Sequence, residues 1–203
     1  AKDGLQSVGE GGAIRHRQIS DVLDALLPSW TVAKIDIKDV GTGLWNPLTA
    51  GGRPGVLDFT QSELTPSFFL FALINEDWLG FYFAGLVKLG IAGLGAFLFL
   101  RLFIGTPSAL FGGAVYTFIG FHSAWFYWPQ VSTSAWIPWL LWSVAGWHLY
   151  LKARWCLMIV LTAIMLILGG MPAVAAYGFY SAALLAALFP IVVKTPLKKS
   201  LKV

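Results

Sequence analysis

From Trp78 to the C-terminus the sequence contains no Asp or Glu, although ten acidic residues precede that point. Apolar side chains dominate this later part and make up 57% of the whole chain, against 12% for charged side chains. A soluble protein of this size could not bury so much apolar surface, so a bilayer has to cover it. We therefore expect an all-α integral membrane protein.

Five apolar stretches after Asp77 approach the ~20 residues that a bilayer core requires. They cover residues 78–102, 108–126, 132–149, 155–170 and 172–193. The fourth is short, and only "GGMP" separates it from the fifth, so a tight hairpin and a re-entrant pair both fit this boundary. The predicted fold is about five transmembrane helices preceded by a polar segment.

The basic residues predict how these helices are oriented. Arg101, Lys152, Arg154 and the lysines of the "KTPLKKSLK" tail all fall on one side of a five-helix arrangement. By the positive-inside rule that side is cytoplasmic. Residues 1–77, the "HSAWFYWPQVSTS" connection and "GGMP" then share the extracytoplasmic side. We accordingly divide the chain into an extracytoplasmic segment, 1–77, and a helical bundle with a basic cytoplasmic tail, 78–203.

Within the polar segment, Ile19–Trp30 has the sequence "ISDVLDALLPSW", with apolar residues at helical spacing and Ser20 as a plausible N-cap. This pattern predicts an amphipathic helix. A position on the bilayer surface, a contact with a partner and the core of an ordinary domain all fit it.

Any carboxylate that acts as a general base or metal ligand must come from residues 1–77, because the predicted spans contain none. The candidates are Asp21, Asp24, Asp58 and Glu63, each of which also fits a solvated surface group. Asp58 is favoured because it follows a stiff stretch rich in Gly and Pro, "LWNPLTAGGRPG". The pattern predicts no metal ligand set, and a role for a divalent metal stays open.

Basic and polar residues supply candidate substrate contacts. Arg15, Arg17 and Arg53 suit a phosphate group, although anionic headgroups would attract the same charges. Lys88 lies well inside the first predicted span, so we expect it to face the bundle interior or a wet cavity. Such a lysine would also suit a transporter of anionic substrates. Nucleic acid is not an expected partner, because the basic residues are few and scattered.

His122 and Gln130 flank the aromatic run "SAWFYWP" in the connection between the second and third predicted spans. Such a group can stack on a sugar ring and hydrogen-bond its hydroxyls. An ordinary belt of aromatic residues at the membrane interface fits equally well.

Five segments, in this order, resemble the YfhO-like bacterial membrane proteins, which belong among the GT-C type glycosyltransferases. They are "LWNPLTAGGRP", "VLDFTQSELTP", "VKLGIAGLGAFLFLR", "LFGGAVYTFIGFHSAWFYWPQVSTSAWIPWLLW" and "LGGMPAVAAYGFY". The resemblance implies a multi-pass enzyme of the bacterial inner membrane. Such an enzyme transfers a sugar from a polyprenyl-phosphate carrier to an extracytoplasmic acceptor, with an essential carboxylate in the first extracytoplasmic loop.

The sequence also departs from this family. Gly12 or Ala13 stands where an Asp is usual, Lys88 where a His is common, and Met171 replaces the His of a "GHP" segment. The helix that usually precedes the first loop and the usual C-terminal continuation are not part of the sequence, which suggests a fragment or a split subunit. The alternative function is therefore a non-catalytic membrane subunit that uses a degenerate GT-C-like fold to bind other subunits of a complex.

Overall fold

The computed structural model describes residues 22–39, 45–46, 51–54 and 59–192. The described helices are η2 (a π-helix, Val22–Leu26), α1 (Leu27–Asp39), η3 (a 3-10 helix, Phe59–Gln61), α2 (Pro66–Leu73), α3 (Asp77–Leu100), α4 (Thr106–Thr117), α5 (Gly120–Ala124), α6 (Pro129–Ser134), α7 (Ile137–Tyr150), α8 (Ala153–Leu168) and α9 (Pro172–Val192). Two-residue strands, β1 (Trp45–Asn46) and β2 (Arg53–Pro54), pair antiparallel. The predominantly helical fold is confirmed for the described part of the chain.

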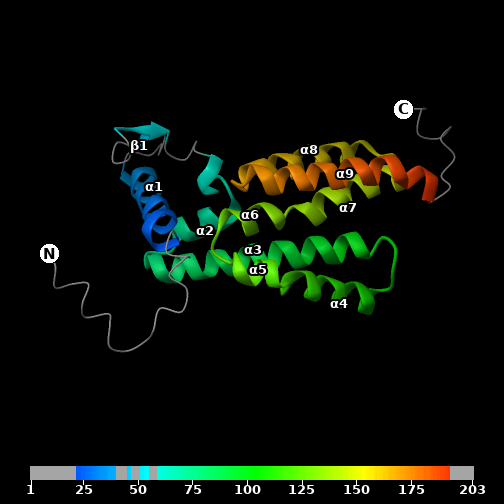
Figure 1. Cartoon of the computed structure of the whole chain (residues 1–203), viewed down its shortest axis with the longest axis horizontal. Helices are drawn as coiled ribbons and strands as arrows, with labels where there is room; N and C mark the ends of the chain where they lie inside the picture. Colours follow the sequence, from blue (N-terminus) through cyan, green and yellow to red (C-terminus); the bar gives the residue numbers. More distant parts are fainter. Residues whose placement is uncertain (1–21, 40–44, 47–50, 55–58, 193–203) are drawn as a thin grey trace.

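The long helices form an elongated bundle with different elements at its two ends. Figure 1 shows α3, α4, α7, α8 and α9 running along the long axis of the molecule. Helices α1, α2 and α6 lie at one end, which we call the cap end, and the α3–α4 turn and the end of α9 lie at the other. The α7–α8 turn, which carries Lys152, also belongs to that second end, which we call the basic end.

Two described helices, α3 and α9, are long and apolar enough to cross a bilayer, and α8 is apolar but shorter. Both long helices expose large apolar side chains, among them Leu86, Leu94, Leu184, Leu188 and Ile191. Apolar side chains that are exposed along a whole helix need another apolar phase to cover them. The described fold therefore holds two candidate membrane-spanning helices.

The second and third predicted spans are each interrupted rather than continuous. Helix α4 ends at Thr117, whose hydroxyl donates to the Gly113 carbonyl at 2.9 Å, and α5 starts only at Gly120. Between α6 and α7 the Ser134 carbonyl accepts from the Tyr116 hydroxyl at 3.0 Å, and Pro138 has no N–H to bond to it. Two spans that hydropathy alone predicted as continuous are thus each divided into two helices.

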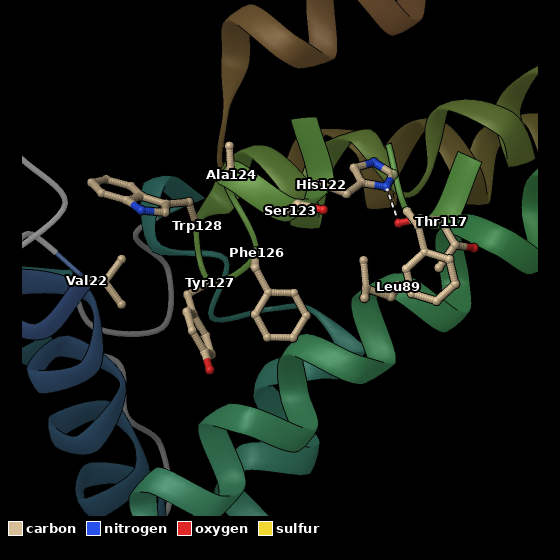
Figure 2. A pocket seen from close by; sticks show the side chains of 10 residues that line it. Val22, Leu89, Thr117, His122, Ser123, Ala124, Phe126, Tyr127 and Trp128 are labelled. Carbon is tan, nitrogen blue, oxygen red and sulfur yellow. Dashed lines mark hydrogen bonds between the residues drawn. The ribbon is translucent and has the colours of Figure 1, made fainter. Parts of the chain in front are cut away.

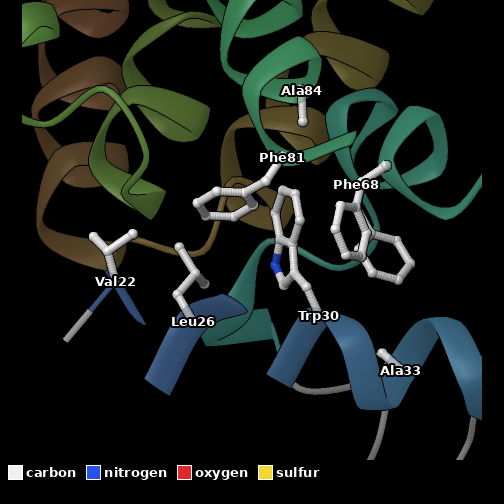
Figure 3. Packing of buried hydrophobic residues seen from close by; sticks show 8 residues of the cluster. Val22, Leu26, Trp30, Ala33, Phe68, Phe81 and Ala84 are labelled. Atoms are coloured by element: carbon white, nitrogen blue, oxygen red, sulfur yellow. The ribbon is translucent and has the colours of Figure 1, made fainter. Parts of the chain in front are cut away.

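The amphipathic helix predicted at Ile19–Trp30 can be compared with the structure from Val22 onward. Residues 19–21, including Ser20, lie outside the described residues, and the helix runs past Trp30 to Asp39. Its buried side is formed by Val22, Leu26, Trp30 and Ala33. Trp30 is fully buried and packs with ring centroids 5.3 Å from those of Phe68, Phe71 and Phe81 (Figure 3). This apolar side therefore packs against α2 and the start of α3.

Polar contacts reinforce this packing at the cap end. Lys34, which is buried on α1, donates to the Asn75 carbonyl at 3.0 Å and to Asp77 Oδ1 at 2.7 Å. The Thr31 hydroxyl donates to the other oxygen of Asp77 at 2.8 Å. The start of α3 is thereby held against α1 by an ion pair with hydrogen bonds on both carboxylate oxygens.

Candidate functional site

A cavity of about 360 Å³ opens at the cap end, where four segments meet. We call it the cap cavity. Its walls come from η2, η3, the start of α6 and the α8–α9 turn, and include Leu26, Gln61, Trp128, Gln130, Gly170 and Met171. These residues are far apart in sequence, so only the folded chain forms the cavity.

Two polar atoms of residues in the cavity wall lack a partner within the described part of the chain. The Trp128 indole Nε1 and the Gln130 carbonyl Oε1 are both buried and form no hydrogen bond there. A buried polar atom without a partner destabilises a fold, so natural proteins usually keep such atoms for a ligand or an ordered water. One atom donates and the other accepts, so a hydroxyl group could satisfy both.

The α8–α9 turn is fixed against α6 and against the residue that follows η3 by hydrogen bonds. The Ser62 hydroxyl donates to the Gly169 carbonyl at 2.6 Å, and the Met171 N–H donates to Thr133 Oγ1 at 3.1 Å. Gly170 has a φ of +90°, a conformation that side chains disfavour. These contacts give the wall of the cap cavity a defined shape.

A second cavity of about 290 Å³ lies between η2, α3 and α5, and Trp128 lines it as well. Its wall is mostly apolar and includes Leu89, Phe126 and Tyr127 (Figure 2). Burial raises the pKa of the Tyr127 phenol above its usual value, so this group stays neutral. The composition of this wall suits an apolar group better than a sugar.

His122 lies in the wall of the second cavity, and both of its ring nitrogens have partners. Nδ1 lies 3.3 Å from the Thr117 carbonyl and Nε2 lies 3.1 Å from the Ser134 hydroxyl. The carbonyl can only accept, so Nδ1 carries a proton and donates to Thr117. His122 therefore helps to fix α5 against α6, whereas Gln130 faces the cap cavity.

Lys88 is buried inside the bundle, as its position in the first predicted span suggested. Its Nζ donates to the Tyr127 carbonyl at 3.0 Å and lies 5.2 Å from the centroid of the Trp30 ring. Lys88 is not among the residues that line either cavity. Its contact with a substrate stays a prediction.

The candidate carboxylates and arginines fall into two groups. Asp21, Asp58, Arg15 and Arg17 lie outside the described residues, and of Arg53 only the backbone, in β2, is described. Asp24 is exposed, and Glu63 is buried and accepts from the Ser29 hydroxyl at 2.9 Å. Among the described residues, no group of three or more His, Cys, Asp or Glu side chains could hold a metal ion.

Sequence reasoning missed Thr60 and Gln61 in the cap cavity, and it included Trp128 only as one member of the aromatic run "SAWFYWP". Trp128 precedes Pro129, and this pair in the "FYWPQ" run marks the turn into α6. That pattern could have singled out Trp128 within the run. Nothing in the sequence indicated that η3 would lie beside it.

No family model, curated protein or solved structure matches the chain. The function is therefore inferred from the residues, from the resemblance of the five segments named above and from the geometry.

Proposed function

We propose that the chain is a multi-pass protein of the bacterial inner membrane that transfers sugar in the manner of GT-C glycosyltransferases. In this proposal the five predicted spans correspond to α3, α4 with α5, α6 with α7, α8, and α9. The cap end lies on the extracytoplasmic side and the basic tail in the cytoplasm. The resemblance of five ordered segments and the two apolar helices α3 and α9 support this assignment.

The cap cavity holds the sugar of a polyprenyl-phosphate donor in this proposal. The observation that carries it is the pair of unpartnered atoms, Trp128 Nε1 and Gln130 Oε1, buried in the cavity wall. A sugar hydroxyl accepts from the first and donates to the second, and the indole offers an apolar face to the ring. The apolar chain of the carrier extends into the bilayer beside the bundle.

Transfer requires a base and a group that binds the leaving phosphate. A carboxylate, with Asp58 as the leading candidate, removes the proton of the acceptor hydroxyl as its oxygen bonds to the anomeric carbon. The bond from that carbon to the carrier phosphate breaks, and Arg15, Arg17 or Arg53 stabilises the departing polyprenyl phosphate. A divalent metal could assist the same phosphate, and the proposal does not depend on it.

The test is sugar transfer from a labelled polyprenyl-phosphate donor by protein reconstituted in liposomes. Gln130→Ala and Trp128→Phe each remove one hydrogen-bonding atom, so we expect donor binding to weaken about tenfold. Ser123→Ala is the matched control, because Ser123 lines only the second cavity. Donor binding that both cap-cavity variants leave unchanged would overturn the proposal. Asp58→Asn separates chemistry from binding, since it should abolish transfer and leave the donor bound.

A second candidate function is a non-catalytic subunit of a membrane complex. It is favoured by two of the described carboxylates at the cap end, Glu63 and Asp77, because each accepts a hydrogen bond from α1 and so has a structural role. Under this alternative the purified chain transfers no sugar and co-purifies with a partner in a fixed ratio. Transfer by the isolated chain would exclude it.

A further inference from the structure

A third cavity, of about 340 Å³, lies at the basic end and is lined by Trp142, Arg154, Trp155, Leu157 and Met158. We propose that it binds the phosphate group of an anionic phospholipid. The inference depends on the membrane placement proposed above but not on sugar transfer. We call this cavity the basic-end cavity.

Arg154 supplies the positive charge. Its guanidinium lies 5.3 Å from the centroid of the Trp155 ring, which holds the charged group beside the indole. No Asp or Glu follows Asp77 in the sequence, and the structure pairs Arg154 with no carboxylate among the described residues. An arginine that has no carboxylate partner can use its forked donors on a phosphate.

Trp155 provides an independent indication of a ligand. The side chain is 5% exposed and lines the basic-end cavity, and its Nε1 has no hydrogen-bond partner in the described part of the chain. Its ring is fixed from other sides, because the Tyr150 ring stacks on it and the Trp142 ring meets it edge-on. An N–H held in this way needs an acceptor, and phosphate oxygens are acceptors.

The start of α8 adds to the same potential. The helix begins at Ala153 after Lys152 and has no side-chain cap, although the Trp155 backbone N–H donates to the Lys152 carbonyl at 2.9 Å. Its 16 residues give it a substantial dipole, whose positive end lies at Arg154. The charge of Arg154, the indole N–H of Trp155 and the start of α8 therefore all favour binding of a negatively charged group in this cavity.

An apolar path for the lipid tails leads away from this cavity. Leu157, which lines the cavity, is followed on the exposed side of α8 by Leu161 and Ile164, at spacings of four and three residues. Side chains at these spacings share one face of a helix. A headgroup in the basic-end cavity would thus place its acyl chains along α8, a geometry that free phosphate does not require.

Native mass spectrometry of the full chain in neutral detergent tests the proposal with three probes: phosphatidylglycerol, phosphatidylcholine and inorganic phosphate. We expect phosphatidylglycerol to bind more tightly than the other two. Arg154→Gln should weaken it about tenfold, and Trp155→Phe, which keeps the ring but loses the N–H, should weaken it about threefold. Arg101→Gln is the matched control, since Arg101 lies at the same end, is exposed and does not line the cavity.

The outcomes separate this proposal from its rivals. Equal binding of phosphatidylglycerol by wild type and Arg154→Gln would overturn it, as would equal losses in Arg154→Gln and Arg101→Gln. Inorganic phosphate that binds as tightly as the lipid, with the same dependence on Arg154, would assign the cavity to a free anion instead. If Trp155→Phe does not fold, the comparison of the two arginine variants still decides. Sugar transfer plays no part in these readouts, so failure of the glycosyltransferase proposal would leave them interpretable.

Discussion

The ammonium group of Lys88 lies 5.2 Å from the centroid of the Trp30 ring and hydrogen-bonds the carbonyls of Tyr127 and Trp128. One buried side chain of α3 therefore contacts both the N-terminal segment and the backbone beside the cap cavity. Trp30 in turn donates its indole N–H to the Gln61 carbonyl at 2.6 Å, and Gln61 also lines that cavity. The shape of the cap cavity thus depends on contacts made by Lys88 and Trp30.

Lys88→Met should lower the free energy of unfolding by about 1–2 kcal/mol, because it leaves two carbonyls without their donor and removes the cation over Trp30. Thermal unfolding in detergent measures this loss. Limited proteolysis should also cut residues 22–39 faster in the variant. Lys38→Met, at an exposed position on α1, is the control and should change neither the thermal unfolding nor the rate of proteolysis. A variant as stable as wild type would mean that burying the charge costs as much as its contacts return.

Replacing Lys34 should destabilise the protein more than replacing Asp77, although the two residues form one ion pair. Lys34→Met leaves the Ile74 and Asn75 carbonyls without a donor, so we expect the free energy of unfolding to fall by about 2 kcal/mol. Asp77→Asn keeps an oxygen that can accept from Lys34 or Thr31, so we expect a loss below about 1 kcal/mol. Chemical unfolding of both variants provides the comparison. Equal losses would show that the ion pair itself, rather than the carbonyl contacts, fixes α1.

Gly169→Ala should destabilise the protein by about 1–3 kcal/mol. An added Cβ would lie 2.5 Å from the Thr133 Cα, and backbone atoms cannot move aside as a flexible side chain can. Gly90→Ala is the matched control, because nothing lies within 4 Å of its added Cβ in the interior of α3. For Gly90→Ala we expect the free energy of unfolding to rise by about 0.5–1 kcal/mol. Thermal unfolding of the two variants should therefore shift in opposite directions.

The helical class could be predicted from the sequence because hydropathy is a local property that a short window reports. The breaks after Thr117 and before Ile137 could not be predicted in this way, because hydropathy does not report contacts between segments such as the hydrogen bond from Tyr116 to the Ser134 carbonyl. The predicted end of the first helix at Trp30 was also wrong, because the helix continues to Asp39. Trp30 is enclosed by phenylalanines from α2 and α3.

The candidate site could be predicted only one residue at a time. Gln130 was singled out from its aromatic neighbours, and the structure places it in the cap cavity. Apart from Trp128 and Pro129, the other residues of the cavity wall come from segments tens of residues away, and no local pattern encodes that meeting. Trp155 drew no attention because a tryptophan near a membrane boundary is common, and only the fold shows that its N–H lacks a partner.

The central claim is that the cap end and the basic end lie on opposite sides of a membrane, with the cap cavity outside. Cys156 is the only cysteine, so Thr60→Cys and Lys152→Cys can each be placed in a Cys156→Ser background. Both positions are exposed. A membrane-impermeant maleimide should label Thr60→Cys in intact cells and Lys152→Cys only after permeabilisation. Labelling of both in intact cells, or of neither before permeabilisation, would contradict the account.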